Sequence, residues 1–129
     1  MQKSAKLNLK LNAKNSCDGM TAFHLACKHG HLKLAEVFMQ KSVELELELN
    51  AKDSLGYTAF HLACNYGHIR IAKMLMEKSV EYSIDLNGKD LLEQTPFHIA
   101  CKNGNLEIAQ IIIQKSKDLM IQGSLSCRV

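Results

Sequence analysis

The sequence predicts an all-α solenoid, in which short helix-turn-helix units stack side by side. A seven-residue phrase recurs in phase, beginning at Thr21, Thr58 and Thr95, which sets a period of 37 residues. A threonine opens each phrase and a glycine follows it, as expected at the two ends of a helix. A second apolar run at helical spacing comes after each glycine. These observations predict paired helices that repeat along the chain.

The repeat covers nearly the whole chain of 129 residues. The phrase reads Thr-Ala-Phe-His-Leu-Ala-Cys at 21–27 and 58–64, and Thr-Pro-Phe-His-Ile-Ala-Cys at 95–101. Residues 3–14 parallel 41–52, so the leader matches the end of a further unit. We therefore divide the chain into a partial repeat with the first finger (1–20), three repeats (21–57, 58–94 and 95–121) and a C-terminal tail (122–129).

Each unit has its own start and stop signals. The threonine hydroxyl is a preferred N-cap, and Pro96 suits the first helical position. Gly30, Gly67 and Gly104 supply the left-handed conformation that ends the first helix. The second helices are predicted at about residues 31–42, 68–79 and 105–117.

After the second helix the periodicity changes. Residues 43–49 and 80–86 alternate apolar and polar side chains strictly, which predicts a strand or an extended arm. Turn-forming residues follow, as at 50–56. Each unit is thus predicted to run helix, turn, helix, extended arm and tight turn.

These residues resemble the ankyrin repeat, with its turn, its Thr-Pro-Leu-His first helix and its Gly-His before an amphipathic second helix. The resemblance implies a stack with short β-hairpin-like fingers. Two departures stand out. The period exceeds the usual length of about 33 residues, and the four extra residues align near 43–46 and 80–83, where they should lengthen either the second helix or the arm that leads to the next finger. Glu93 stands where the other units have Gly19 and Gly56, so we expect a looser or differently turned third finger.

Composition and charge exclude several classes. The 47% apolar share argues against disorder, and no apolar stretch approaches the roughly 20 residues of a membrane span. No secretory signal is recognisable at the start, so we expect an intracellular protein of the cytoplasm or nucleus. The basic excess lies in the leader, with four lysines and no acid in residues 1–15. This distribution predicts neither a nucleic-acid nor a membrane partner.

The His-x-x-Cys pairs raise chemical alternatives. His24 and Cys27, like their counterparts at 61/64 and 98/101, share a helix face, so a metal-binding protein is one alternative. Stacked repeats lie about 10 Å apart, whereas zinc bonds are only about 2.0–2.3 Å long. We therefore predict buried reduced thiols, with no metal, no other cofactor and no enzymatic activity. The resemblance implies that each histidine ties one finger to the next.

The surface remains as the functional candidate. We expect a protein–protein interaction module that binds its partner through the concave side, formed by the finger tips and the exposed side of the first helices. Tyrosine is typical of interface anchors. The predicted partner-binding residues are Met20, Lys28, His29, Ser54, Leu55, Tyr57, Asn65, Tyr66, Leu91, Leu92, Gln94, Lys102 and Asn103.

The two ends leave alternatives open. Terminal units of a solenoid need polar caps, and the first full unit looks like an interior one. Leu119, Met120 and Ile121 could cover part of the last flank, and residues 123–129 look frayed. Either the chain is an interior fragment of a long scaffold with no binding role of its own, or its uncapped terminal repeats associate with another copy.

Overall fold

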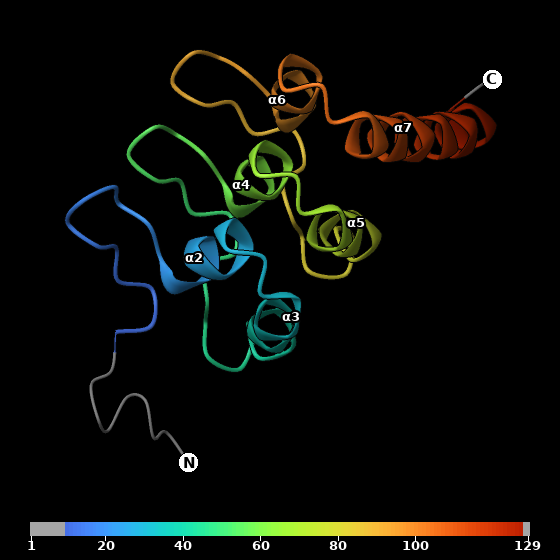
Figure 1. Cartoon of the computed structure of the whole chain (residues 1–129). Helices are drawn as coiled ribbons and strands as arrows, with labels where there is room; N and C mark the ends of the chain where they lie inside the picture. Colours follow the sequence, from blue (N-terminus) through green and yellow to red (C-terminus); the bar gives the residue numbers. More distant parts are fainter. Residues whose placement is uncertain (1–9, 128–129) are drawn as a thin grey trace.

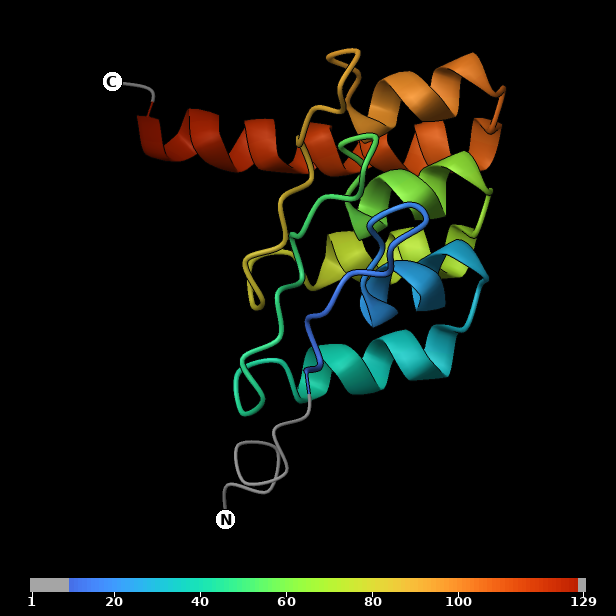
Figure 2. The same cartoon turned by 90° about the vertical axis from the view of Figure 1, so that its left-hand side faces the viewer.

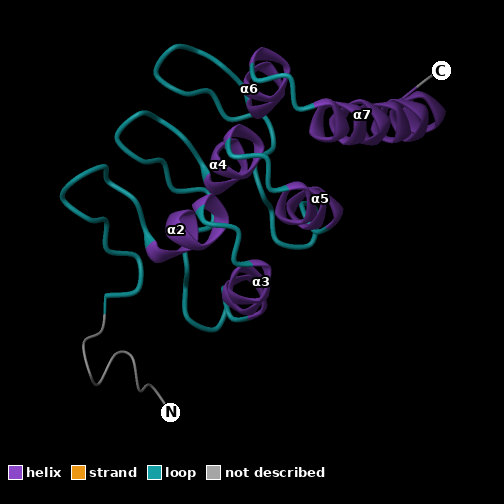
Figure 3. Ribbon diagram, viewed as in Figure 1, coloured by secondary structure: helices purple, strands orange, loops and turns teal. Residues whose placement is uncertain are grey.

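The computed structural model describes the backbone of residues 10–127 and the side chains of residues 10–118. Two rows of helices form the molecule, and a loop projects as a finger before each inner helix (Figure 1). Over the described residues there are helices and loops but no strand (Figure 3). The predicted all-α solenoid is confirmed. The inner row is α2 (Ala22–Lys28), α4 (Ala59–Asn65) and α6 (Pro96–Lys102), and the outer row is α3 (Leu32–Gln40), α5 (Ile69–Glu77) and α7 (Leu106–Cys127).

The predicted helix signals are confirmed at the inner row. The hydroxyls of Thr21, Thr58 and Thr95 each accept a hydrogen bond from the backbone N–H three residues later. The glycine after each helix has a positive φ, such as 78° at Gly30. Thr caps and Gly stops therefore set the length of these helices at seven residues.

The last outer helix is longer than predicted. α3 and α5 begin within a residue of the expected start and end two residues early, whereas α7 runs to Cys127 rather than 117. It includes residues 119–121, whose side chains lie outside the described set. The expected fraying from residue 123 is wrong as far as Cys127, and residues 128–129 lie outside the described residues.

The extended arms predicted at 43–49 and 80–86 are wrong over residues 43–46 and 80–83. The chain instead closes a compact turn after α3 and after α5; in the first of these, Leu47 N–H donates to the Ser42 carbonyl at 2.8 Å and Glu46 N–H to the Val43 carbonyl at 3.3 Å. Glu46 takes the left-handed conformation, with φ of 53°. Ser83 repeats it with φ of 54°. This pattern is a Schellman motif, so the four extra residues extend the helix end rather than form a strand.

The arms beyond these turns are held by side chains. They run alongside one another (Figure 2), and asparagine replaces the backbone pairing of a sheet. Asn50 donates to the Ser83 carbonyl and accepts from Asp85 N–H, both at 2.8 Å. Asn12 makes the same pair of bonds to residues 46 and 48. One asparagine per arm thus fixes the register of consecutive repeats.

The core lies between the two rows and between consecutive repeats. Phe60, Leu62, Ile71, Leu75 and Ile108 are among its fully buried side chains. Cys27 and Cys64 are buried, as predicted. The prediction is wrong for Cys101, which is exposed because no repeat packs beyond α6 among the described residues.

Among the described residues, no helix combines the length and the apolar character needed to cross a membrane.

Candidate functional site

One aspartate builds the turn of the second finger, and another builds the turn of the third. Asp53 Oδ1 accepts from the backbone N–H groups of Leu55 and Tyr57, both at 2.9 Å. Asp90 Oδ1 accepts equivalently from Leu92 and Gln94, at 2.9 and 2.7 Å. The expectation that the third finger is looser or differently turned is therefore wrong: Glu93 adopts the required positive φ of 63° in the same turn.

Neighbouring fingers are joined at their tips. Leu91 N–H donates to the Leu55 carbonyl at 3.0 Å, and Ser54 N–H donates to the Asp18 carbonyl at 2.9 Å. These bonds fix the tips relative to one another before any partner arrives. The fingers thus form one continuous edge across the repeats (Figure 1).

The repeated histidines fix the finger bases. Thr21 N–H donates to His24 Nδ1 at 3.0 Å, so the ring proton is on Nε2, which donates to the Tyr57 carbonyl at 2.9 Å. His61 makes the same bond to Gln94. The role that the resemblance implied, a tie from one finger to the next, is confirmed at both positions. Burial lowers the pKa of His24 and His61, which keeps both rings neutral.

The thiols beside these histidines are chemically inert. Burial raises the pKa of Cys27 and Cys64 to about 12, so neither is a thiolate near neutral pH. Over the described part of the chain, no three metal-ligating side chains gather at one point. In the first two repeats, the buried thiols of Cys27 and Cys64 pack in the core and the rings of His24 and His61 bridge neighbouring fingers.

The predicted partner-binding residues differ in how much of each side chain is exposed to solvent. Met20 is buried, with 6% of its surface exposed, so its predicted place on the exposed surface is wrong. The turn of this finger is made by Asn15, whose side chain accepts from Met20 N–H at 3.2 Å. Lys28, Tyr57, Asn65 and Gln94 are half-buried. The remaining predicted residues are exposed: His29, Ser54, Leu55, Tyr66, Leu91, Leu92, Lys102 and Asn103.

Those residues form two groups. Leu55, Leu91 and Leu92 lie at the tips of the second and third fingers. At the ends of the inner helices, the Lys28 ammonium lies 5.7 Å from the centre of the Tyr66 ring. Asn103 donates to the Asn65 side chain at 2.7 Å. We call the exposed and half-buried members of the predicted set the finger surface; its described contacts run across all three repeats.

Tyr57 has a different position from Tyr66. Its ring stacks on the buried His61 ring, with centroids 5.5 Å apart and an interplanar angle of 18°. Burial raises the pKa of Tyr57. Its principal contact is therefore with the finger base, while Tyr66 is 49% exposed on the surface.

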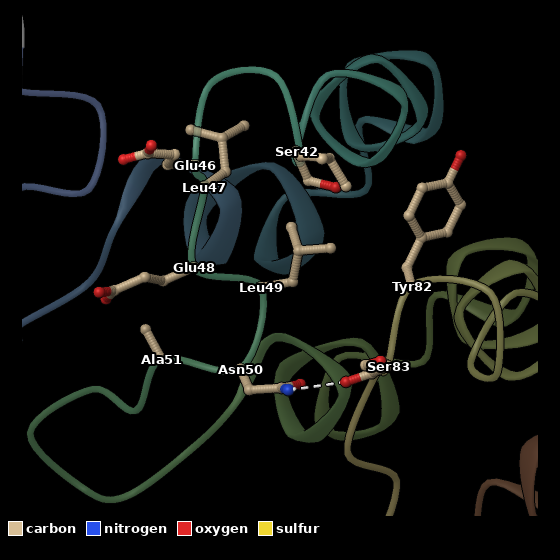
Figure 4. Close-up of a pocket in the computed structure, with 10 residues that line it drawn as sticks. Ser42, Glu46, Leu47, Glu48, Leu49, Asn50, Ala51, Tyr82 and Ser83 are labelled. Atoms are coloured by element: carbon tan, nitrogen blue, oxygen red, sulfur yellow. Dashed lines mark hydrogen bonds between the residues drawn. The ribbon is translucent and has the colours of Figure 1, made fainter.

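A second surface feature was not predicted. A groove of about 560 Å³ lies beside the compact turns, between the arm at 46–51 and Tyr82 (Figure 4). Leu47 and Leu49 line it, and the Asn50–Ser83 bond closes one end. Val43, at its rim, is exposed. The turn that creates this groove comes from the four extra residues, and the alternating pattern in the sequence concealed that turn.

The geometry defines a helical repeat protein with a preformed edge of joined fingers. A family model described as ankyrin repeats in three copies matches residues 2–90, and one described as an ankyrin repeat matches residues 92–121. The chain belongs to the ankyrin repeat family, whose members are generally non-enzymatic protein–protein interaction modules. No curated protein matches the sequence.

Proposed function

We propose that this chain binds a partner protein through the finger surface. The observation that carries the proposal is the group of exposed apolar side chains at Leu55, Leu91 and Leu92, on two finger tips that a backbone hydrogen bond joins. An isolated exposed leucine is ordinary, but a contiguous apolar patch is typical of an interaction site. Tyr66, Lys102 and Asn103 are also exposed, at the ends of α4 and α6.

Preorganisation supports the same proposal. The tips are joined through backbone hydrogen bonds, and the turns are fixed by Asp53 and Asp90. A surface that is already ordered loses little conformational entropy on binding. The expected mechanism is therefore recognition by a fixed surface, with Tyr66 and the tip leucines as apolar anchors.

The partner is expected to present a complementary apolar ridge with an acidic neighbour. Lys28 and Lys102 lie at the ends of inner helices, and Lys28 is already placed over Tyr66. An acidic group of the partner near this ammonium would speed association by electrostatic attraction, while the leucines would supply most of the buried apolar area.

A photo-crosslinking experiment tests the proposal. A photoreactive phenylalanine replaces Tyr66, Leu92 or, as the control, the exposed Val80 on the compact turn. The same partner is expected to crosslink at 66 and 92 and not at 80. The double variant Tyr66→Ala/Leu92→Ser should then weaken the purified partner's binding at least tenfold while the thermal unfolding midpoint is kept.

The opposite pattern would refute the finger surface. A partner that crosslinks at 80 alone, or that binds the double variant with unchanged affinity, uses another face. Tyr57 is left intact in this design because it stacks on His61, so its removal would also disturb the finger base.

The scaffold alternative, in which these repeats lack a binding role, predicts no specific crosslink at either surface position. It is favoured by the exposed apolar side chains on the first and last repeats, such as Leu34 and Ile113.

A further inference from the structure

The last inner helix exposes residues that its predecessors bury. Phe97 is 37% exposed, whereas Phe23 and Phe60 are 6% and 2% exposed. His98 and Cys101 are exposed as well, although their counterparts in the first two repeats are buried. In those repeats, the side chains are covered by the following repeat.

The last outer helix shows the same difference. Ile113 is 47% exposed, whereas the equivalent Met39 and Met76 are 1% and 2% exposed. Leu106, at the start of α7, is 67% exposed. We call this face the C-terminal flank; it consists of Phe97, His98, Cys101, Leu106 and Ile113.

The first repeat carries the opposite half of the interface. Leu34 and Val37 on α3 are 46% and 48% exposed, whereas the equivalent Ile71 and Met74 are 1% and 6% exposed against the preceding repeat. Ala22 is exposed, whereas Ala59 is buried. We call this face the N-terminal flank; it consists of Ala22, Leu34 and Val37.

We infer that two copies of this chain associate head to tail, with the C-terminal flank of one copy packed on the N-terminal flank of the next. The two flanks are the two halves of an interface that already forms twice within the chain, between helices α2 and α4 and between α4 and α6. A second copy continues this interface, since it presents the missing half in the same residue register. The inference rests on the flanks and is independent of the finger surface.

A polar contact is available in the same register. Thr95 N–H donates to His98 Nδ1 at 3.0 Å, so its ring proton is on Nε2, as in His24 and His61. Those two rings donate to the carbonyls of Tyr57 and Gln94 in the following finger. The equivalent acceptor in a second copy is the Met20 carbonyl.

Glu93 limits how closely the fingers can meet at this junction. A Cβ at the equivalent Gly56 would lie 2.9 Å from the Asp90 Cα of the next finger. Glu93 carries that Cβ, so the helical flanks form the contact while the fingers splay apart. Glu93→Gly removes this obstacle and should strengthen the association several-fold.

Head-to-tail contacts of this kind do not close on themselves unless the rotation between copies allows it. The average mass in sedimentation velocity is therefore expected to rise with concentration and to exceed that of a dimer. A protein that stays monomeric over the whole accessible concentration range would overturn the inference.

Two variants, one in each flank, test whether the copies associate head to tail. Leu34→Glu blocks the N-terminal flank and Leu106→Glu the C-terminal flank, and both place an acid in the first turn of a helix, where it is favourable. Each variant alone should be monomeric with unchanged helicity. Their equimolar mixture should form a dimer and stop there, because one intact interface remains.

The mixture distinguishes this arrangement from a symmetric dimer. If wild-type protein associates but the mixture stays monomeric, the head-to-tail geometry is wrong. Val80→Glu, at an exposed site on neither flank, is the matched control and should associate as wild type does. Alkylation of Cys101 should slow as the protein associates, since the contact covers it; an unchanged rate in the associated state would also contradict the inference.

Discussion

Gly56 lies directly against Asp90 of the next finger. A Cβ at Gly56 would be 2.9 Å from both the Asp90 Cα and the Leu91 nitrogen, and its φ of 82° already favours glycine. Glu93 has the same place one repeat later, with φ of 63°, but no finger follows it among the described residues. The stack, and not the turn alone, therefore decides where glycine is required.

This relationship predicts opposite effects at equivalent positions. Gly56→Ala should lower the free energy of unfolding by about 1–3 kcal/mol, because it adds a strained backbone and a contact with Asp90. Glu93→Gly should raise it by about 0.5–1 kcal/mol, the left-handed strain of about 1–2 kcal/mol less the added entropy of unfolded glycine. Urea unfolding measures both. Effects of opposite sign but equal size would show that contact between the fingers adds nothing to the strain of the left-handed backbone.

The asparagine bridge between arms gives a second prediction. Asn50→Ala should lower the free energy of unfolding by about 1–2 kcal/mol, since it removes two cross-arm hydrogen bonds worth about 0.5–1.5 kcal/mol each. Asn87, at the equivalent position in the next arm, is exposed like Asn50, but among the described residues its side chain makes no cross-arm hydrogen bond. Asn87→Ala is therefore the control and should be nearly neutral in the same assay. A neutral Asn50→Ala would mean that the arms need no side-chain bridge.

The buried histidines predict a pH dependence. Burial lowers the pKa of His24 and His61 below 6.5, so unfolding takes up protons under mildly acidic conditions. Their contribution to stability is full above about pH 6.5 and falls as the pH drops toward the lowered value. Each proton taken up reduces the free energy of unfolding by at most about 1.4 kcal/mol per pH unit.

Paired variants isolate this effect. His61→Gln should unfold at lower urea concentration than wild type at pH 7.5 and should show a weaker loss between pH 7 and pH 5. His29→Gln, at an exposed ring, should keep the wild-type slope. If both variants lose stability with the wild-type slope, protonation of His61 does not drive the change.

The thiols predict selective alkylation. At low protein concentration, iodoacetamide should modify the exposed Cys17 and Cys101 rapidly, while Cys27 and Cys64 react only after unfolding. The reason is burial, which also raises the pKa of both buried thiols to about 12. Peptide mapping by mass spectrometry reports each site. Fast modification of Cys64 in folded protein would contradict the packed interface between α4 and α6.

Much of the fold could be predicted from local chemistry. The helix caps, the glycine stops and the histidine bridges depend on residues that recur in each repeat. The repeated sequence pattern was therefore enough to predict them. The turn at 43–46 was missed because strict alternation of valine, leucine and glutamate is also compatible with a helix end, and only the left-handed Glu46 distinguishes the two.

The errors at the ends have a different cause. Cys101 lies in the same phrase as Cys27 and Cys64, so nothing local shows that it is exposed. Exposure there depends on whether another repeat stacks on α6. Met20 was also misplaced: it is buried, whereas Tyr57 at the equivalent position is half-buried. The local sequence determines the fold of one repeat. Whether a face of that repeat is exposed depends on whether another repeat packs against it.

Hydrogen–deuterium exchange of the chain with and without its purified partner tests the central claim most directly. Recognition through the finger surface predicts slower exchange at residues 53–57 and 90–94 and at the ends of α2, α4 and α6, with no change at the compact turns at 43–46 and 80–83. Protection confined to those compact turns, with the fingers unchanged, would contradict it.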